Sequence, residues 1–201
     1  TSWAETADLS TAVFVHESGI IGTQSAAISF GGNDGAVTGQ TEEWSQGIAI
    51  GAWATSGSLN TARQGLAGAG TQDAALAFGG DDITAVTEQY NGSTWAEVNN
   101  LNEARRFLAG AGTQTAALAF GGDPTPGSTA NTESWNGAVW TEVNNLNTAR
   151  RQFAGGGTVP SALAFGGETP GTAQFDNTES WNGTSWTEVA DLNTARQELA
   201  G

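Results

Sequence analysis

The chain has 201 residues, with 21 acids, six Arg, no Lys and a formal net charge of -15. Such a surface repels phosphate backbones and anionic lipid headgroups, which argues against nucleic acid and membrane partners. The absence of Cys excludes disulfides and thiolate metal sites, and no apolar run approaches the ~20 residues that a membrane-spanning helix needs. The 29 Gly, about twice the usual share, favour many short strands joined by tight turns over long helices.

A tandem repeat with a period of about 45 residues runs through the chain, marked by four landmarks that keep one order. They are Ala-Leu-Ala-Phe-Gly-Gly, Thr-Glu-Ser-Trp-Asn-Gly, Trp-(Thr/Ala)-Glu-Val and Leu-Asn-(Thr/Glu)-Ala-Arg. The first landmark, with a weaker earliest copy, contains Phe30, Phe78, Phe120 and Phe165. We place the complete repeats at about 9–58, 59–100, 101–145 and 146–191, with partial repeats at 1–8 and 192–201. Because no linker interrupts the series, residues 1–201 are expected to form a single domain.

Each repeat predicts four strands, here given in chain order for the third repeat. The small-residue run 108–112 predicts the first strand, and Ala-Ala-Leu-Ala-Phe, stopped by Gly-Gly, predicts the second. The third ends at Trp135, and Asn136-Gly137 predicts a tight hairpin turn in which both residues have positive φ. The fourth strand begins at Trp140. Four strands per repeat, with Gly and Ala innermost and aromatic residues further out, indicate the antiparallel blades of an all-β propeller.

The order of these residues resembles the kelch repeat family. Gly121-Gly122, Trp135 and Trp140 match the Gly-Gly, aromatic and Trp positions of a kelch repeat, and the other units follow the same order. The Ala-Gly-rich version looks like kelch-like proteins of phages and marine metagenomes. The resemblance implies a kelch-like β-propeller with four-stranded antiparallel blades.

The two ends of the chain carry related sequence. The segment from Trp3 resembles the segment from Trp186, four periods later. A closed ring of four blades would give both segments the same place. We therefore expect a full ring of five or more blades, with partial blades at both ends and self-association through these incomplete blades. The first repeat diverges, since Val13 replaces the repeated Arg and the segment between Trp44 and Trp53 is longer.

The sequence offers no catalytic constellation. A single histidine, His16, has no nucleophile-elbow pattern near it, and Tyr90 lacks the Cys that a galactose oxidase-type copper centre requires. Glycine runs such as 155–157 lack the Lys of a phosphate loop. An acidic residue follows each Gly-Gly, as at Asp81 and Asp123. These acids either reflect the preference of Asp and Asn for turns or belong to a loop that binds calcium. We predict no catalytic residue, metal or cofactor.

Two sets of repeated carboxylates are expected to be outer-strand charges or partners for arginine, instead of a paired-acid active site. They are Glu42, Glu88, Glu133 and Glu179 in the third strands, and Glu5, Glu97, Glu142 and Glu188 in the fourth strands.

Four arginines occupy the same position in successive repeats, just before the first strand, and are the predicted ligand-binding residues: Arg63, Arg105, Arg150 and Arg196. Two interpretations stay open. In the first, each Arg binds carbonyls or a Glu of the adjacent blade and locks blades together. Alternatively, the four form a ring around a pocket for an anionic or polyhydroxyl ligand, on the face where kelch propellers often bind partners.

These features predict a non-catalytic binding or structural module that mediates attachment or assembly through a protein or glycan partner. The likeness to phage proteins implies a virion or extracellular fibre setting. The alternative is a fragment of a kelch-type enzyme, galactose oxidase-like or carbohydrate-active, whose active residues lie outside this chain.

Overall fold

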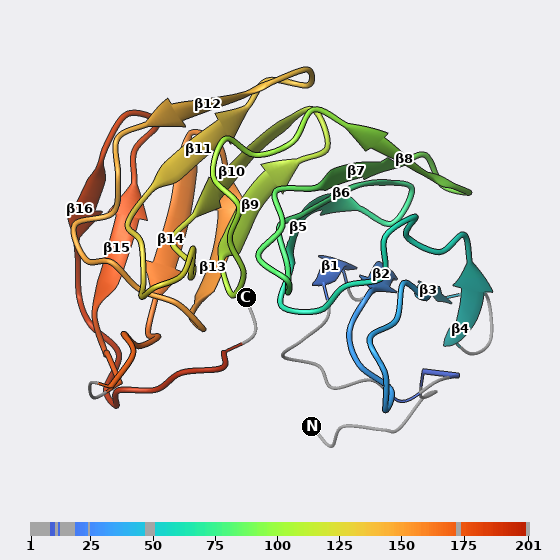
Figure 1. Ribbon diagram of the computed structural model, residues 1–201, viewed down its shortest axis with the longest axis horizontal. Coiled ribbons are helices and arrows are strands. Elements are labelled where there is room, and N and C mark those ends of the chain that lie inside the picture. Colours follow the sequence, from blue (N-terminus) through green and yellow to red (C-terminus); the bar gives the residue numbers. More distant parts are fainter. Residues whose placement is uncertain are drawn as a thin grey trace.

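The computed structural model describes residues 9–10, 12, 19–23, 25–46, 51–171 and 174–199. It forms four antiparallel four-stranded sheets arranged as a four-bladed β-propeller (Figure 1). The predicted all-β class, the propeller and the four strands per repeat are confirmed. The predicted partial repeat 1–8, together with Val13 and His16, lies outside the described residues. A ring of five or more blades stays a prediction.

Each repeat forms one blade, whose strands follow in order from the axis to the rim (Figure 1). Blade 1 contains β1 (Gly19–Thr23), β2 (Ala26–Phe30), β3 (Thr41–Gln46) and β4 (Gly51–Ser56). Blade 2 contains β5 (Ala67–Thr71), β6 (Ala74–Phe78), β7 (Thr87–Tyr90) and β8 (Trp95–Val98). Blade 3 contains β9 (Ala109–Thr113), β10 (Ala116–Phe120), β11 (Thr132–Trp135) and β12 (Trp140–Val143). Blade 4 contains β13 (Ala154–Thr158), β14 (Ser161–Phe165), β15 (Thr178–Trp181) and β16 (Trp186–Glu188).

The predicted hairpin turn is wrong in one detail. Only the glycine of each Asn-Gly pair has positive φ, as at Gly92 with φ 88°. The connection from β7 to β8 has four residues, and the Asn91 carboxamide oxygen accepts hydrogen bonds from the backbone N–H groups of Ser93 and Thr94. The Asn side chain thus caps the turn, which is the other common use of Asn in turns. In blade 1, the longer segment lengthens β3 and β4 to six residues each, with Trp44 still opposite Trp53.

Aromatic pairs fill the space between neighbouring blades. In each pair, the Phe that ends the second strand of one blade packs against the Trp that begins the fourth strand of the next blade. The three ring-centroid distances are 5.0 Å for Phe30–Trp95, 5.0 Å for Phe78–Trp140 and 4.8 Å for Phe120–Trp186. Each indole N–H also donates to a Thr hydroxyl of the earlier blade, in the pairs Trp95–Thr41, Trp140–Thr87 and Trp186–Thr132. The repeated aromatic residues therefore join successive blades.

The innermost strands pack side by side in the order β1, β5, β9 and β13, and their small residues permit this approach. A Cβ atom added to Gly110 would lie 2.5 Å from the Gly68 carbonyl oxygen and 2.7 Å from the Phe78 ring. The connections into these strands also hydrogen-bond in series, because Phe107 N–H donates to Gly65 O, and Gln152 N–H donates to Phe107 O. Backbone and small side chains thus form the inner wall.

Replacing Gly110 with Ala is expected to lower the free energy of unfolding by about 1–3 kcal/mol, because the added methyl group meets backbone that cannot move independently. Gly156→Ala is the matched control, since a Cβ atom at this glycine of β13 would meet no atom within 4 Å. Urea unfolding of both variants checks this prediction. Equal stability of the two variants would contradict the close packing of β5 and β9.

Candidate functional site

Three of the four predicted ligand-binding arginines lie in buried ion pairs with the repeated glutamates of the third strands. The connection that precedes each inner strand directs its Arg side chain toward the following blade. The Nη–Oε distances are 3.1 Å for Arg105–Glu133 and 2.7 Å for Arg150–Glu179, and Arg63 makes the same pair with Glu88. The exposed fraction of all six side chains is at most 1%. The interpretation of these third-strand glutamates as partners for arginine is confirmed for these three pairs. The expectation that the Glu belongs to the adjacent blade is wrong, because each Glu lies in the same repeat as its Arg.

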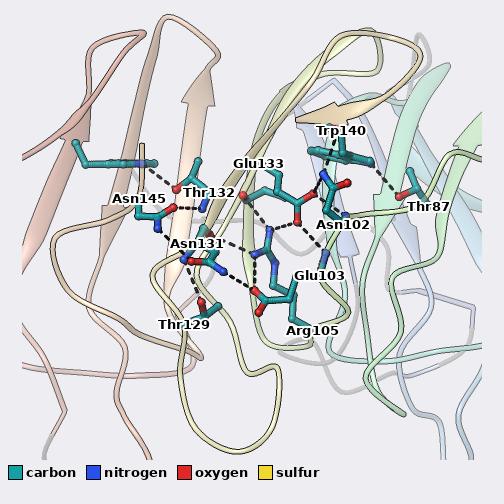
Figure 2. A network of polar contacts seen from close by, with 12 residues as sticks. Thr87, Asn102, Glu103, Arg105, Thr129, Asn131, Thr132, Glu133, Trp140 and Asn145 are labelled. Atoms are coloured by element: carbon teal, nitrogen blue, oxygen red, sulfur yellow. Dashed lines mark hydrogen bonds and ion pairs between the residues drawn. The ribbon is translucent and has the colours of Figure 1, made fainter. Parts of the chain in front are cut away.

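Each glutamate also holds the connection that carries its arginine, as Figure 2 shows for Glu133. Glu133 Oε2 accepts from the backbone N–H of Asn102 at 2.7 Å and from its side-chain amide at 2.8 Å. The same amide donates to the Trp140 carbonyl oxygen at 3.1 Å. Asn60 with Glu88 and Asn147 with Glu179 repeat this arrangement. We call each set of Asn, Arg and Glu a clamp, because it fastens the incoming connection to the outer strands of the blade.

Alternation along the third strand explains why the glutamate points toward the connection. Side chains two residues apart lie on the same side of a strand, so Glu133 lies on the same side as Trp135. Trp135 packs in the interface between blades 2 and 3, along which the connection runs. The Glu-x-Trp spacing therefore places the carboxylate next to the arginine and the indole in the apolar interface.

Burial dominates the electrostatics of the clamps. It lowers the pKa of the Arg63, Arg105 and Arg150 guanidinium groups below the ordinary value, while the paired glutamates raise the pKa in part. A buried charge is tolerated only when it is paired and hydrogen-bonded. Arg150 meets this condition with Glu179 and with the carbonyl oxygens of Gly166 and Asn177, at 3.1 and 2.8 Å. The Arg–Glu pairs of the clamps can therefore stabilise blades without contacting solvent.

Arg196 differs from the other three arginines, because its side chain is exposed and its Nε donates to the Thr194 carbonyl oxygen at 3.2 Å. Its backbone keeps the repeated role, since Gly167 N–H donates to the Arg196 carbonyl oxygen at 2.8 Å, as Gly122 N–H does to Arg150. Ligand binding by the four arginines stays a prediction. Arg196 is the member of the set that solvent reaches.

A second layer of charge lies beside the clamps and crosses three blades. Arg106 Nη1 lies 3.2 Å from Asp81 Oδ1, and Arg106 Nε lies 3.5 Å from Asp123 Oδ2. Arg151 Nη1 lies 2.9 Å from the same Asp123 oxygen, and Arg151 Nη2 lies 3.0 Å from Glu168 Oε1. We call these five residues the charge ladder. From the sequence, the acids after Gly-Gly were noted but were not paired with Arg106 and Arg151, although the two groups occur at matching positions of the repeat.

The charge ladder bears on the calcium alternative. Asp81, Asp123 and Glu168, three of the acids in question, are engaged by arginines in these ion pairs. Within the described ranges, no group of three or more His, Cys, Asp or Glu side chains could hold a metal ion.

No helix long and apolar enough to cross a membrane occurs among the residues that the structure describes.

Tyr90, the only tyrosine, occupies the position of Trp135 and Trp181 in the other blades. Its hydroxyl donates to the Glu43 carboxylate of blade 1 and lies next to the Ser56 hydroxyl, with which it also hydrogen-bonds. Burial, helped by the Glu43 carboxylate, raises the pKa of the phenol from 10.0 to about 12. The phenol therefore joins blades 1 and 2 in its protonated form.

The Tyr90 contribution to stability should depend on alkaline pH. Because the folded state holds the proton more tightly than the unfolded state, this contribution is fully present below pH 10.0 and is lost as the pH rises toward about 12. Spectrophotometric titration of the single phenol checks this prediction, and Tyr90→Phe should remove this part of the alkaline destabilisation. A phenol that ionises at its ordinary pKa in the folded protein would contradict it.

A shallow groove of about 520 Å³ lies on the rim between β12 and the β15–β16 hairpin. Its lining residues include Glu142, Asn144 and Trp181. The Trp181 side chain is buried and its indole N–H donates to the Val159 carbonyl oxygen at 2.7 Å. The groove therefore offers polar groups but little aromatic surface on which a sugar ring could stack.

No protein-family model matches the chain, and no curated protein matches it.

Proposed function

We propose that this chain is a non-catalytic, kelch-like β-propeller that binds a protein or glycan partner and mediates attachment or assembly. By resemblance, the proposed setting is a virion or extracellular fibre. Three of the four repeated arginines, together with their third-strand glutamates, are paired in the clamps. The proposal therefore assigns binding to a different part of the blades, the loops.

The observation that carries the proposal is a contrast between the loops of the two faces. Because the strands of a blade are antiparallel, the loops from second to third strand emerge on one face and the hairpins from third to fourth strand on the other. The loops 31–40, 79–86, 121–131 and 166–177 differ in length and sequence. In blades 2 to 4, the hairpins 91–94, 136–139 and 182–185 all have four residues and begin with Asn-Gly, whereas residues 47–50 of blade 1 have the sequence Gly-Ile-Ala-Ile. Variable loops on a constant scaffold are typical of binding faces.

A loop graft tests this assignment. Partners selected on the wild-type chain from a glycan array and a displayed-peptide library should lose affinity at least tenfold when residues 79–86 replace residues 121–131. The matched control changes the opposite face by Ala138→Thr with Val139→Ser, which copies the hairpin 182–185. Partners that respond to the hairpin change and not to the loop graft would contradict the assigned face.

The enzyme alternative has a separate test. Because this alternative places the active residues outside these 201 residues, the test uses the protein encoded by the full reading frame. We expect that protein to leave a panel of mono- and oligosaccharides unchanged under both hydrolytic and oxidising assay conditions. Appreciable turnover that survives purification to homogeneity would overturn the non-catalytic proposal.

A further inference from the structure

The side of blade 4 that points away from blade 3 carries residues equivalent to those that form a buried surface in blades 2 and 3. We call this surface the leading face of a blade. In blade 2 it contains Leu76 and Phe78, and in blade 3 it contains Leu118 and Phe120, all with an exposed fraction of 0%. In blade 4 the equivalent Leu163 is 44% exposed, and Phe165 is only partly buried. The leading face of blade 4 is therefore apolar and partly uncovered.

The inner strand of blade 4 gives independent evidence for this exposure. Gly156 in β13 stands where Ala69 and Ala111, with exposed fractions of 3% and 4%, stand in β5 and β9. A Cβ atom at Gly156 would meet no atom within 4 Å. In blades 2 and 3 the next blade covers this position, so the leading face of blade 4 has room for another blade.

The contacts within the chain define what such a face accepts. Each covered leading face packs against small residues from the second strand of the next blade and against an indole from its fourth strand. In blade 2, Leu76 and Phe78 lie in one buried cluster with residues of blade 3, namely Ala117, Ala119 and Trp140. Each indole also donates to a Thr hydroxyl, and Thr178 is the equivalent Thr of blade 4. The matching occupant is therefore the opposite side of a blade of the same repeat, which we call the trailing face.

The trailing face of blade 1 is the complementary surface at the other end of the arc. Ala27 is partly exposed there, whereas the equivalent Ala117 of blade 3 is buried. Among the described strands, β1 and β13 do not pack as β1 packs on β5, and blades 1 and 4 form the two ends of the arc (Figure 1). Each copy thus presents one face of each kind.

We propose that the leading face of blade 4 binds the trailing face of blade 1 of a second copy of this chain. The contact is head-to-tail, so it produces a closed ring of copies or an open filament, depending on the angle between them. It buries apolar surface between two molecules that each carry a net charge of -15. Salt screens that repulsion and strengthens apolar contact, so association increases with ionic strength.

Sedimentation analysis over a range of protein and salt concentrations tests the proposal. The wild-type chain should form oligomers whose share rises with both concentrations, and Leu163→Glu should weaken association at least tenfold while the unfolding midpoint stays unchanged. Val139→Glu is the matched control, because Val139 is also 44% exposed but lies in a hairpin away from the leading face. A monomeric wild-type chain under all conditions, or equal association of both variants, would overturn the proposal.

Cysteine cross-linking distinguishes a second copy from closure of the chain on itself and does not depend on the stability of Leu163→Glu. The natural sequence has no Cys, so introduced thiols are the only ones present. A mixture of Ala27→Cys and Leu163→Cys proteins should give a disulfide-linked pair faster than either variant alone. Rapid disulfide formation within a monomeric Ala27→Cys/Leu163→Cys double variant, without linked pairs in the mixture, would show closure within one chain and refute the proposal.

Discussion

Replacing Arg105 with Met is expected to lower the free energy of unfolding by about 3–5 kcal/mol. The substitution leaves the Glu133 carboxylate buried, with an exposed fraction of 1%, without the charge that lies 3.1 Å from it. Removing one partner of a buried ion pair costs this much because the remaining charge is neither solvated nor paired. The backbone N–H groups of Asn102 and Glu103 still donate to that carboxylate. The variant therefore loses the ion pair but keeps these two hydrogen bonds.

Arg196→Met is the matched control, since the two arginines share one repeat position and differ in burial. This change should alter the free energy of unfolding by no more than about 0.5 kcal/mol, as for other surface substitutions. Chemical denaturation followed by tryptophan fluorescence measures both. Similar effects at the two positions would mean that burial in the clamp does not determine the contribution of the arginine.

The second large effect is expected from Trp140→Ala, which should cost about 3–5 kcal/mol. The indole packs on Phe78 of blade 2 and on Trp135 of its own blade, with ring centroids 5.0 and 5.3 Å away. Its N–H donates to the Thr87 hydroxyl at 3.1 Å. The substitution therefore leaves a cavity at the interface of two blades and an unpaired buried hydroxyl.

Thr87→Val separates the hydrogen bond from the packing, because the two side chains have similar shapes. It should cost about 1–3 kcal/mol, the usual penalty for leaving the indole N–H buried without an acceptor. If Trp140→Ala cost no more than Thr87→Val, the account of the indole as the main interblade contact would be wrong. Denaturation curves of the two variants, compared at the same temperature, provide this test.

The fold was predictable because each local signal agreed with the others. Gly and Ala at the start of a repeat, Gly-Gly after the second strand and Trp at the start of the fourth strand all recur with one period. The φ angle of Asn91 was not predictable from the Asn-Gly pair alone, because the same pair serves both two-residue and four-residue turns. The loop length, which decides between them, depends on where the flanking strands stop pairing.

The clamps were predictable in type but not in detail. Arg105 and Glu133 have counterparts at matching positions of the other repeats, so a structural role for the arginines was predicted, with a ligand pocket left open as the alternative. The Arg–Glu pairs are buried because the connection between blades runs past Trp135. That path depends on how the blades pack and cannot be read from one repeat. The exposure of Leu163 was not predictable from its local sequence, because Leu163 shares the run Ala-Leu-Ala-Phe-Gly-Gly with the fully buried Leu118 and only the neighbouring blade differs.

A double-mutant cycle on Arg105 and Glu133 tests most directly the claim that the repeated charges hold the blades. Arg105→Met, Glu133→Gln and the double variant would be compared with wild type by urea unfolding. We predict an interaction energy of roughly 1.5–3 kcal/mol, as for contacting residues in one buried network. Additivity within about 0.5 kcal/mol would contradict the claim, because it is the result expected of distant, independent sites.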